Sequence, residues 1–381
     1  MPALLLWGDT VRSAALRHEL PFVVLDPFLF IDDGPGRRWV LSSPLEAARL
    51  AQVRPDVEQV PLTDLGFRDL LESGLSRPEL LVELASRMVA RTGVREALVH
   101  GELAVAVADR LRADGLTLQV DSEAVDDRRR VKTPAELAGI LRAQRAAEAG
   151  MAAAAAVLRE ASAGPDGLLV ARGEPVTAER VRDALRAACA AAGCPAPNDI
   201  IVASVGQGFG HEPGSGPLPA GLPIQIDLWP QDEDTGCWAD MTRTFVAGGE
   251  PPAAVRAQEE LVRAALEEVR EATRPGVTGR ALHALACDRF EAAGFRTTRT
   301  GPGDDPTEGM QFGLGHGVGL EIDEAPGLGQ TGRRELVAGD VVAVEPGLWD
   351  REVGGVRFED LLLVTDAGCE TLTRFPYDLE P

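Results

Sequence analysis

The first third of the chain alternates short apolar runs with segments in which apolar residues recur every three or four positions. The apolar runs predict β-strands, and the amphipathic segments between them predict α-helices. The expected strands cover residues 3–7, 22–30, 37–41, 96–100 and 116–120. The expected helices cover residues 10–20, 44–53, 78–91 and 102–115. Alternation of this kind indicates an α/β domain.

A charged stretch separates this region from the rest of the chain. Residues 121–132, DSEAVDDRRRVK, contain few apolar side chains, and we interpret them as a solvated linker. Thr133, Pro134 and Glu136 then suit the first turn of a helix, as a capping threonine, an N1 proline and a capping-box glutamate. Because 381 residues exceed one ordinary core, the sequence predicts two domains, residues 1–124 and residues 125–381.

The second domain contains one pattern twice. VTAERVRDALRAACAAAG begins at Val176, and VTGRALHALACDRFEAAG begins at Val277. Each of these helical segments is followed by two strand-like runs, and each run carries one carboxylate. The four carboxylates are Asp227, Asp240, Glu345 and Glu359. The pattern indicates an internal duplication with two halves related by a pseudo-two-fold axis.

Carboxylates in apolar strands require a partner, since an unpaired buried charge is costly. A single glutamate such as Glu345 or Glu359 could instead lie at an exposed strand end, but the repeat disfavours that alternative. If the two halves face each other, the four carboxylates meet and repel one another, and each also loses its hydration. Two divalent cations would supply the matching positive charge.

His316 is the fifth candidate ligand. It lies between glycines in GLGHGVGLEIDEAP, although a loop histidine considered alone more often forms only a hydrogen bond. Carboxylates with one imidazole and no thiolate favour Mn²⁺, Co²⁺, Fe²⁺ or Zn²⁺. Two such ions about 3.5–4 Å apart polarise a carbonyl and activate a water. The sequence therefore predicts hydrolytic chemistry.

The composition excludes several other classes of protein. Acidic residues outnumber basic residues by 60 to 38, for a net charge of −22, which argues against binding to nucleic acid or to anionic membranes. The five cysteines are scattered without a CxxC pair, so neither a disulfide framework nor a thiolate zinc site is expected. MPALLLWGDT lacks the basic region of a signal peptide. We therefore expect a cytoplasmic protein.

Four segments resemble the signatures of the pita-bread metallopeptidases, the group of prolidase, aminopeptidase P and methionine aminopeptidase. They are DLWPQDEDTGCWADMTRTF, GLGHGVGLEIDEAP, VVAVEPGLW and GGVRFEDLLLVT. The resemblance covers roughly residues 125–375 and implies an α+β pita-bread domain. Residues 1–124 resemble the creatinase-type α/β domain of prolidases and aminopeptidases P. The implied protein is a homodimeric Xaa-Pro peptidase that cleaves before proline with a metal-bridging hydroxide.

The resemblance also implies a role for each ligand. Asp227 would bind one metal, His316 and Glu345 would bind the other, and Asp240 and Glu359 would bridge both. Mn²⁺ or Co²⁺ is the first expectation for the two ions, with Zn²⁺ and Fe²⁺ as alternatives. Glu345 would also transfer protons during catalysis.

Further positions match residues that act around the metals in this family. Thr242 and Arg357 would orient the ligands. His211, in GQGFGHEPGSG, would contact the substrate or the tetrahedral intermediate, although a histidine in such a loop could also cap a turn. The substrate implied by the resemblance is a short peptide or a small amide.

Two features depart from the family pattern. The interval between Asp227 and Asp240 is longer than usual, which predicts an enlarged loop with solvated acidic residues at 232–234. Asp323 replaces the histidine that usually holds the substrate near the scissile bond. Its carboxylate could contact a cationic group of the substrate or form a salt bridge at the rim of the site.

Asp323 therefore leaves alternatives to the peptidase. One is a pita-bread hydrolase or lyase that acts on a small non-peptide metabolite. Another is a catalytically silent relative that binds a partner, but the complete set of five candidate ligands argues against it.

Overall fold

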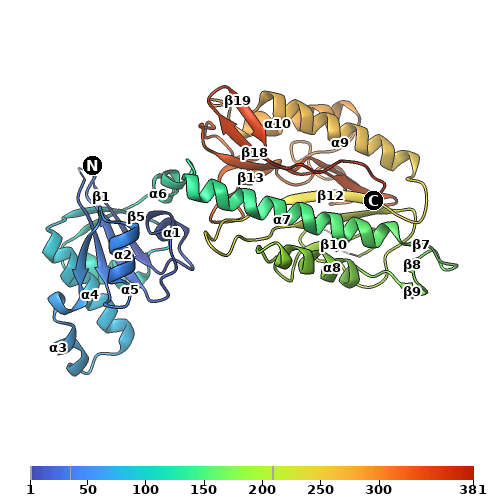
Figure 1. Cartoon of the computed structure of the whole chain (residues 1–381). Helices are drawn as coiled ribbons and strands as arrows, with labels where there is room; N and C mark the ends of the chain where they lie inside the picture. The colour runs from blue at the N-terminus through green and yellow to red at the C-terminus, as the bar shows by residue number, and fades with distance from the viewer. Residues whose placement is uncertain (1, 35, 208–209) are drawn as a thin grey trace. The chain divides into compact units, whose positions relative to one another are not determined.

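A computed structural model describes residues 2–34, 36–207 and 210–381. The chain divides into two compact units, Met1–Arg129 and Arg130–Pro381 (Figure 1). Each unit has its own hydrophobic core. Among the described residues, no helix combines the length and the apolar character that a membrane crossing requires.

A six-stranded mixed sheet forms the centre of the first unit, in the order β4-β3-β2-β1-β5-β6. The strands are β1 (Ala3–Gly8), β2 (Phe28–Asp32), β3 (Arg38–Ser42), β4 (Glu58–Pro61), β5 (Glu96–Val99) and β6 (Thr117–Val120). The α-helices are α1 (Ala14–Glu19), α2 (Ala47–Val53), α3 (Phe67–Glu72), α4 (Arg77–Thr92), α5 (Val105–Ala113) and α6 (Ser122–Asp126), with 3₁₀ turns η1 (Leu62–Leu65) and η2 (Asp127–Arg129). The predicted α/β class is confirmed.

The strands of this unit differ locally from the expectation. The strand expected over residues 22–30 begins only at Phe28, because Pro27 cannot donate a backbone hydrogen bond to a sheet. Strand β4 was not expected at all. Only Val60 of its four residues is buried, so the strand has no apolar run for sequence analysis to detect.

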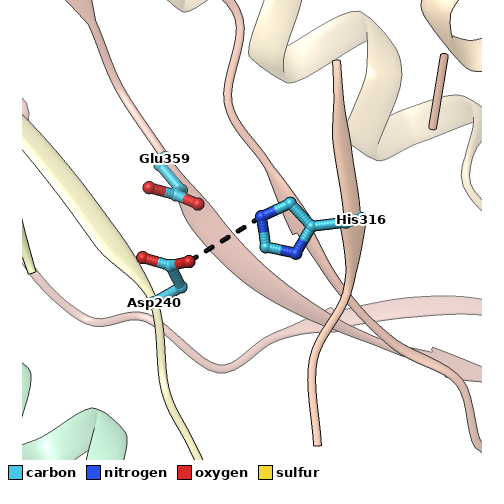
Figure 2. Close-up of side chains that lie close together, drawn as sticks. All are labelled: Asp240, His316 and Glu359. Carbon is cyan, nitrogen blue, oxygen red and sulfur yellow. Dashed lines mark ion pairs between the residues drawn. The ribbon is translucent and has the colours of Figure 1, made fainter. Parts of the chain in front are cut away.

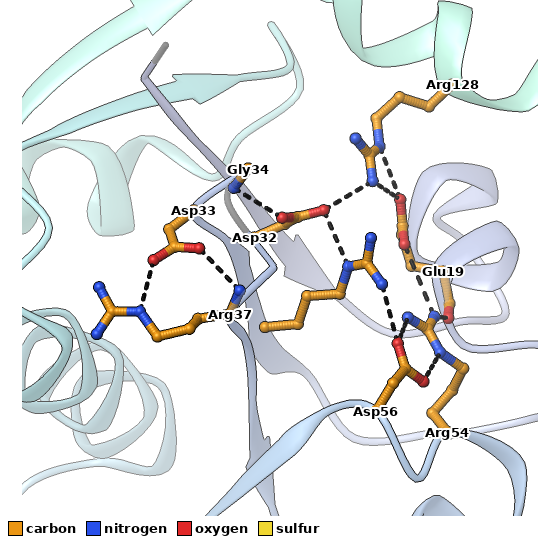
Figure 3. A network of polar contacts seen from close by, with 9 residues as sticks. Glu19, Asp32, Asp33, Gly34, Arg37, Arg54, Asp56 and Arg128 are labelled. Atoms are coloured by element: carbon orange, nitrogen blue, oxygen red, sulfur yellow. Dashed lines mark hydrogen bonds and ion pairs between the residues drawn. The ribbon is translucent and has the colours of Figure 1, made fainter.

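Asp32, at the end of β2, is the centre of a polar network in the first unit (Figure 3). Its carboxylate accepts hydrogen bonds from the Nε of Arg38 at 3.1 Å and from the Nη2 of Arg128 at 3.0 Å. Arg128 also forms an ion pair with Glu19 of α1 at 2.6 Å. Burial raises the pKa of Asp32, but hydrogen bonds from the Gly34 N–H and from Arg38 outweigh it, so the pKa lies below its usual value.

The second unit contains two helix pairs. They are α7 (Pro134–Arg159) with α8 (Ala178–Ala191), and α9 (Ala253–Ala272) with α10 (Gly279–Ala292). Figure 1 shows α9 and α10 on one side of the strands and α8 on the other. Thr133 and Glu136 form the expected capping box of α7.

The strands of this unit form several antiparallel sheets. The first sheet contains β10 (Ile201–Ala203), β11 (Pro223–Leu228) and β12 (Met241–Val246). The second, in the order β14-β13-β15-β18-β19, contains β13 (Gly315–Gly317), β14 (Glu324–Leu328), β15 (Val341–Val344), β18 (Asp360–Thr365) and β19 (Gly368–Thr371). Smaller sheets consist of β16 (Gly347–Asp350) with β17 (Gly354–Arg357), and of β7 (Ser162–Ala163), β8 (Leu169–Ala171) and β9 (Glu174–Pro175).

The predicted repeat is visible in α8 and α10. Each helix has 14 residues. Thr177 and Thr278 cap them through side-chain oxygens that accept from a backbone N–H three residues later, both at 3.2 Å. Gly193 and Gly294 follow the two helices with positive φ angles of 81° and 91°, the conformation that ends a helix and favours glycine. The α+β fold with an internal repeat is confirmed.

The expectation of solvated charges is wrong at two places. Arg130, in the supposed linker, is buried, and its Nη2 lies 2.6 Å from Asp340 Oδ2. In the enlarged loop between β11 and β12, Glu233 is exposed as expected, but Asp232 is buried. Asp232 accepts hydrogen bonds at 2.8 Å from both the Nε and the Nη2 of Arg142 on α7. This pair fastens the loop to the helix.

We predict that Asp32→Asn lowers the free energy of unfolding of the first unit by about 1–2 kcal/mol near neutral pH, since it weakens two charge-assisted hydrogen bonds. A carboxylate whose folded-state pKa is depressed stabilises the fold above its unfolded pKa of about 3.9. That contribution is lost as the pH falls through the folded-state value. Denaturant unfolding of both proteins should therefore show a difference at neutral pH that shrinks in acid.

Asp33→Asn is the matched control, because Asp33 pairs with the exposed Arg37 and its loss should cost less than about 0.5 kcal/mol. Equal effects of the two substitutions, or a difference that does not depend on pH, would contradict the role assigned to Asp32.

Candidate metal centre

The five residues predicted as metal ligands lie at the ends or in the middle of strands from both halves of the second unit. Asp227 is in β11, and Asp240 directly precedes β12. His316 is the central residue of β13. Glu345 directly follows β15, and Glu359 directly precedes β18.

Three of the five side chains converge on one point. Asp240, His316 and Glu359 each offer one ligand atom, and these atoms lie within 4.8 Å of one another. Figure 2 shows the two carboxylates and the imidazole facing the same space. Because they lie in β13 or directly before β12 and β18, the convergence depends on the packing of the two halves.

Glu345 and Asp227 adjoin this group. The Nε2 of His316 lies 3.8 Å from Asp240 Oδ2 and 3.8 Å from Glu345 Oε1. Arg357 connects the remaining carboxylate, since its Nη1 lies 3.4 Å from Glu345 Oε2 and its Nη2 forms an ion pair with Asp227. All five predicted ligands therefore belong to one connected cluster.

Thr242 and Arg357 lie against the carboxylates, at the positions expected of residues that orient ligands. The hydroxyl of Thr242 donates to Glu359 Oε2 at 2.7 Å. The Nε of Arg357 donates to that same hydroxyl at 3.3 Å. The two side chains therefore restrict the rotation of Glu359 and Asp227, which is how neighbouring groups fix the geometry of a metal site.

The glycines beside His316 are required by close backbone contacts. Gly315 has a φ of 150°, and a Cβ atom there would lie 1.9 Å from the carbonyl oxygen of Ala343. A Cβ atom on Gly317 would lie 2.4 Å from the carbonyl oxygen of Ala325. Strand β13 can therefore fit between β14 and β15 only with glycine at both positions, and this fit directs His316 into the cluster.

The negative charges of the carboxylates strongly repel one another. Burial and then the charges of Glu359, Asp227 and Glu345 raise the pKa of Asp240 well above its usual value. Burial and then the charges of Glu345 and Asp227 do the same to the pKa of Glu359. Burial also raises the pKa of Glu345, although Arg357 and His316 lower it in part. In the absence of a cation, the cluster therefore favours bound protons.

The cluster fits divalent metal ions. Asp227 Oδ1 is buried and accepts no hydrogen bond, so one carboxylate oxygen is left without a partner. Four carboxylates and one imidazole form a donor set that suits Mn²⁺, Co²⁺, Fe²⁺ and Zn²⁺. Positive ions at this point would remove both the repulsion and the unsatisfied oxygen.

His211 and Asp323 stand apart from the five. His211 is exposed, and its imidazole lowers the pKa of Glu345, so it lies within electrostatic reach of the cluster. Residues 208–209, in the predicted loop before it, are outside the described part of the chain. Asp323 is exposed in a bend before β14, and the described residues give it neither a contact with the five ligands nor a salt bridge.

Sequence analysis did not find the buried ion pair beside Asp323. Lys132 and Glu324 pair with side chains only 3% and 2% exposed. Glu324 Oε2 also accepts a hydrogen bond from the N–H of Glu321, so the pair supports the bend that carries Asp323. Lys132 had been assigned to the charged linker, and nothing in its local sequence distinguishes a buried lysine from a solvated one.

The chain is similar in sequence to known proteins. Residues 138–366 match the family model of metallopeptidase family M24. The Xaa-Pro dipeptidase of Pyrococcus furiosus is 36% identical over 141 residues, 37% of each chain. The putative dipeptidase YkvY of Bacillus subtilis is 34% identical over 174 residues, 46% of this chain and 44% of that one. The first of these alignments thus spans little more than a third of the curated relative.

Solved structures show the same fold over nearly the whole chain. The Xaa-Pro dipeptidase from Bacillus anthracis has a TM-score of 0.78 at 22% identity, covering 99% of this chain and 94% of that one. The prolidase from Pyrococcus horikoshii OT3 has a TM-score of 0.74 at 21% identity, covering 100% and 95%. The pita-bread fold is therefore confirmed, and the chain belongs to metallopeptidase family M24.

Proposed function

We propose that this protein is a dinuclear metal-dependent peptidase that hydrolyses the bond before proline in short Xaa-Pro peptides. The convergence of Asp240, His316 and Glu359 within 4.8 Å is the observation that carries the proposal. The names of the relatives, several of them Xaa-Pro dipeptidases, support the choice of substrate.

The arrangement of the ligands supports two ions. Arg357 pairs with Asp227 and, through Nη1, lies 3.4 Å from Glu345 Oε2, and the charges of Asp227 and Glu345 both raise the pKa values of Asp240 and Glu359. By the resemblance to the family, Asp227 would serve one ion, His316 and Glu345 the other, and Asp240 and Glu359 both. We propose Mn²⁺ or Co²⁺ first as the divalent ions. When bound, they would polarise the substrate carbonyl and activate a water.

The chain's own groups supply positioning and proton transfer. Thr242 and Arg357 hold Glu359 and Asp227 in place. Glu345 would exchange protons with the leaving amine, the role that the resemblance to the family gives it. His211, exposed and within electrostatic reach of Glu345, would contact the substrate carbonyl.

Asp323 supports a second candidate function. Its exposed carboxylate, without a salt bridge among the described residues, is available to a cationic group on a substrate. A pita-bread hydrolase or lyase acting on a small non-peptide metabolite is the activity that this feature would favour. The homodimer and the cytoplasmic location remain predictions from the resemblance and the composition.

A substrate panel tests the two candidates. With Mn²⁺ or Co²⁺ we expect cleavage of Xaa-Pro dipeptides or longer Xaa-Pro peptides, and loss of activity on chelation. Release of proline or of the N-terminal residue can be followed by chromatography. Turnover of small amides without any Xaa-Pro cleavage would instead favour the second candidate.

Glu359→Gln should lower metal content and turnover, each by at least about tenfold, because the substitution removes one anionic donor that both ions would share. Metal analysis of the purified protein and steady-state rates measure the two effects. Glu352→Gln, on an exposed turn of the same unit, is the control and should change neither. Full metal content and full activity in Glu359→Gln would contradict the assignment.

Metal binding should release protons, and the apparent affinity should rise with pH. The pKa values of Asp240 and Glu359 are raised, so the metal-free protein retains protons that the ions must displace. A raised carboxylate pKa also means that the metal-free fold loses stability as the pH rises. Calorimetric titration in buffers with different heats of ionisation measures the protons released. Binding without proton release would show that the carboxylates are already ionised.

A further inference from the structure

Arg243 is a buried cation directly behind the candidate metal centre. It follows Thr242 in β12, and the residue is only 1% exposed. A guanidinium has five N–H donors, and in Arg243 all five are used. Such a group is expensive to bury unless each donor is satisfied and the charge is paired. The partners of Arg243 therefore indicate what it holds together.

The Nη1 group of Arg243 clamps the junction between the two halves of the unit. It donates to the carbonyl oxygens of Thr242 and Glu359, each at 2.8 Å. The N–H of Glu359 donates back to the Thr242 carbonyl at 3.1 Å, and the Thr242 hydroxyl binds the Glu359 carboxylate. Asp240 lies two residues before Thr242. The clamp thus sets the separation between Asp240 and Glu359, one from each half.

The remaining donors of Arg243 bind the C-terminal segment, residues 373–379, and Asp360. Nη2 donates to Asp360 Oδ1 and to the Phe375 carbonyl, both at 2.9 Å. Nε donates to the Pro376 carbonyl, also at 2.9 Å. The ring of Tyr377 lies over the guanidinium, with 4.5 Å between the ring centroid and Cζ, and its hydroxyl donates to the other Asp360 oxygen.

The C-terminal segment is itself attached to the same strands. The N–H of Val246, in β12, donates to the Leu379 carbonyl at 2.7 Å, and Leu379 is buried. The N–H of Leu361, in β18, donates to the hydroxyl of Thr373 at 2.9 Å. Figure 1 likewise shows the C-terminus beside β12. The segment therefore covers Arg243, whose side chain leaves β12 on the face opposite that of Thr242.

We propose that Arg243, held by Asp360 and Tyr377, is a positioning residue that makes metal affinity depend on the C-terminal segment. The inference rests on the proposed function, since it concerns the same centre. Neither Arg243 nor Tyr377 would bind metal or substrate. They act by keeping Glu359 at the correct distance from Asp240, and loss of that spacing weakens the site without removing a ligand.

Two conservative substitutions test the proposal through Mn²⁺ binding, measured by calorimetry on the full chain. Arg243→Lys keeps a positive charge but has three donors on one nitrogen in place of five on three, so it cannot bind both the clamp and the C-terminal segment. It should weaken Mn²⁺ binding about 10- to 100-fold, as loss of a group that orients a ligand does elsewhere. Tyr377→Phe removes only the hydroxyl bonded to Asp360 and should weaken binding several-fold.

Arg130→Lys is the matched control. Arg130 is also buried in the same unit, at 5% exposed. It pairs with Asp340 through Nε at 2.9 Å and Nη2 at 2.6 Å, and it donates to the Glu335 carbonyl. The control should lower the melting temperature about as much as Arg243→Lys and leave the Mn²⁺ dissociation constant within twofold of wild type. Comparable weakening by Arg130→Lys would overturn the proposal, because the effect would then be general destabilisation.

The outcomes distinguish this inference from the proposed function. If the wild-type protein binds Mn²⁺ and the Arg243→Lys and Tyr377→Phe variants bind it equally well, only this inference is overturned. Wild-type protein that binds no Mn²⁺ overturns the proposed function and the inference with it. If Arg243→Lys does not fold, Tyr377→Phe decides, and unchanged affinity in that variant refutes the coupling.

Discussion

The repulsion between the buried carboxylates of Asp240 and Glu359 is the constraint around which the second unit is organised. Two like charges about 4 Å apart oppose one another by roughly 4 kcal/mol at an effective dielectric constant of about 20. That is a large share of the stability of a typical domain. The protein nevertheless keeps these groups among apolar strands, with Asp227 and Glu345 close by. A bound cation would offset the repulsion that this fold otherwise has to tolerate.

The internal duplication explains how the cluster is assembled. Each half contributes a helix pair and two strands, with one carboxylate in or next to each strand. The contact between β12 and β18 brings the carboxylates of the two halves together. Arg357 partly neutralises the carboxylates of Asp227 and Glu345, whereas Thr242 and the backbone hold those of Asp240 and Glu359. His316 lies in β13, a strand that requires glycine on both sides of the histidine to fit between β14 and β15.

Sequence analysis identified the parts of this arrangement that have a local or periodic signal. A repeated segment that starts with Val-Thr and ends with Ala-Ala-Gly marked α8 and α10, and apolar strands with a single acid marked Asp227, Asp240, Glu345 and Glu359. The resemblance to a family supplied Thr242 and Arg357. The charged residues that are buried by contacts distant in sequence were missed, among them Asp232, Lys132 and Arg243. Their burial depends on Arg142, Glu324 and Asp360, and composition alone makes each appear solvated.

The distribution of the ligands over both halves has a consequence for synthesis of the chain. Asp227 and Asp240 leave the ribosome before His316, Glu345 and Glu359 have been translated. The β11–β12 hairpin therefore emerges with its acids in water, and the strands that enclose these acids are added only with the second half. The unit should accordingly close late and from its carboxyl end. A chain arrested after β12 would present an uncovered acidic hairpin to the cell's quality-control proteases.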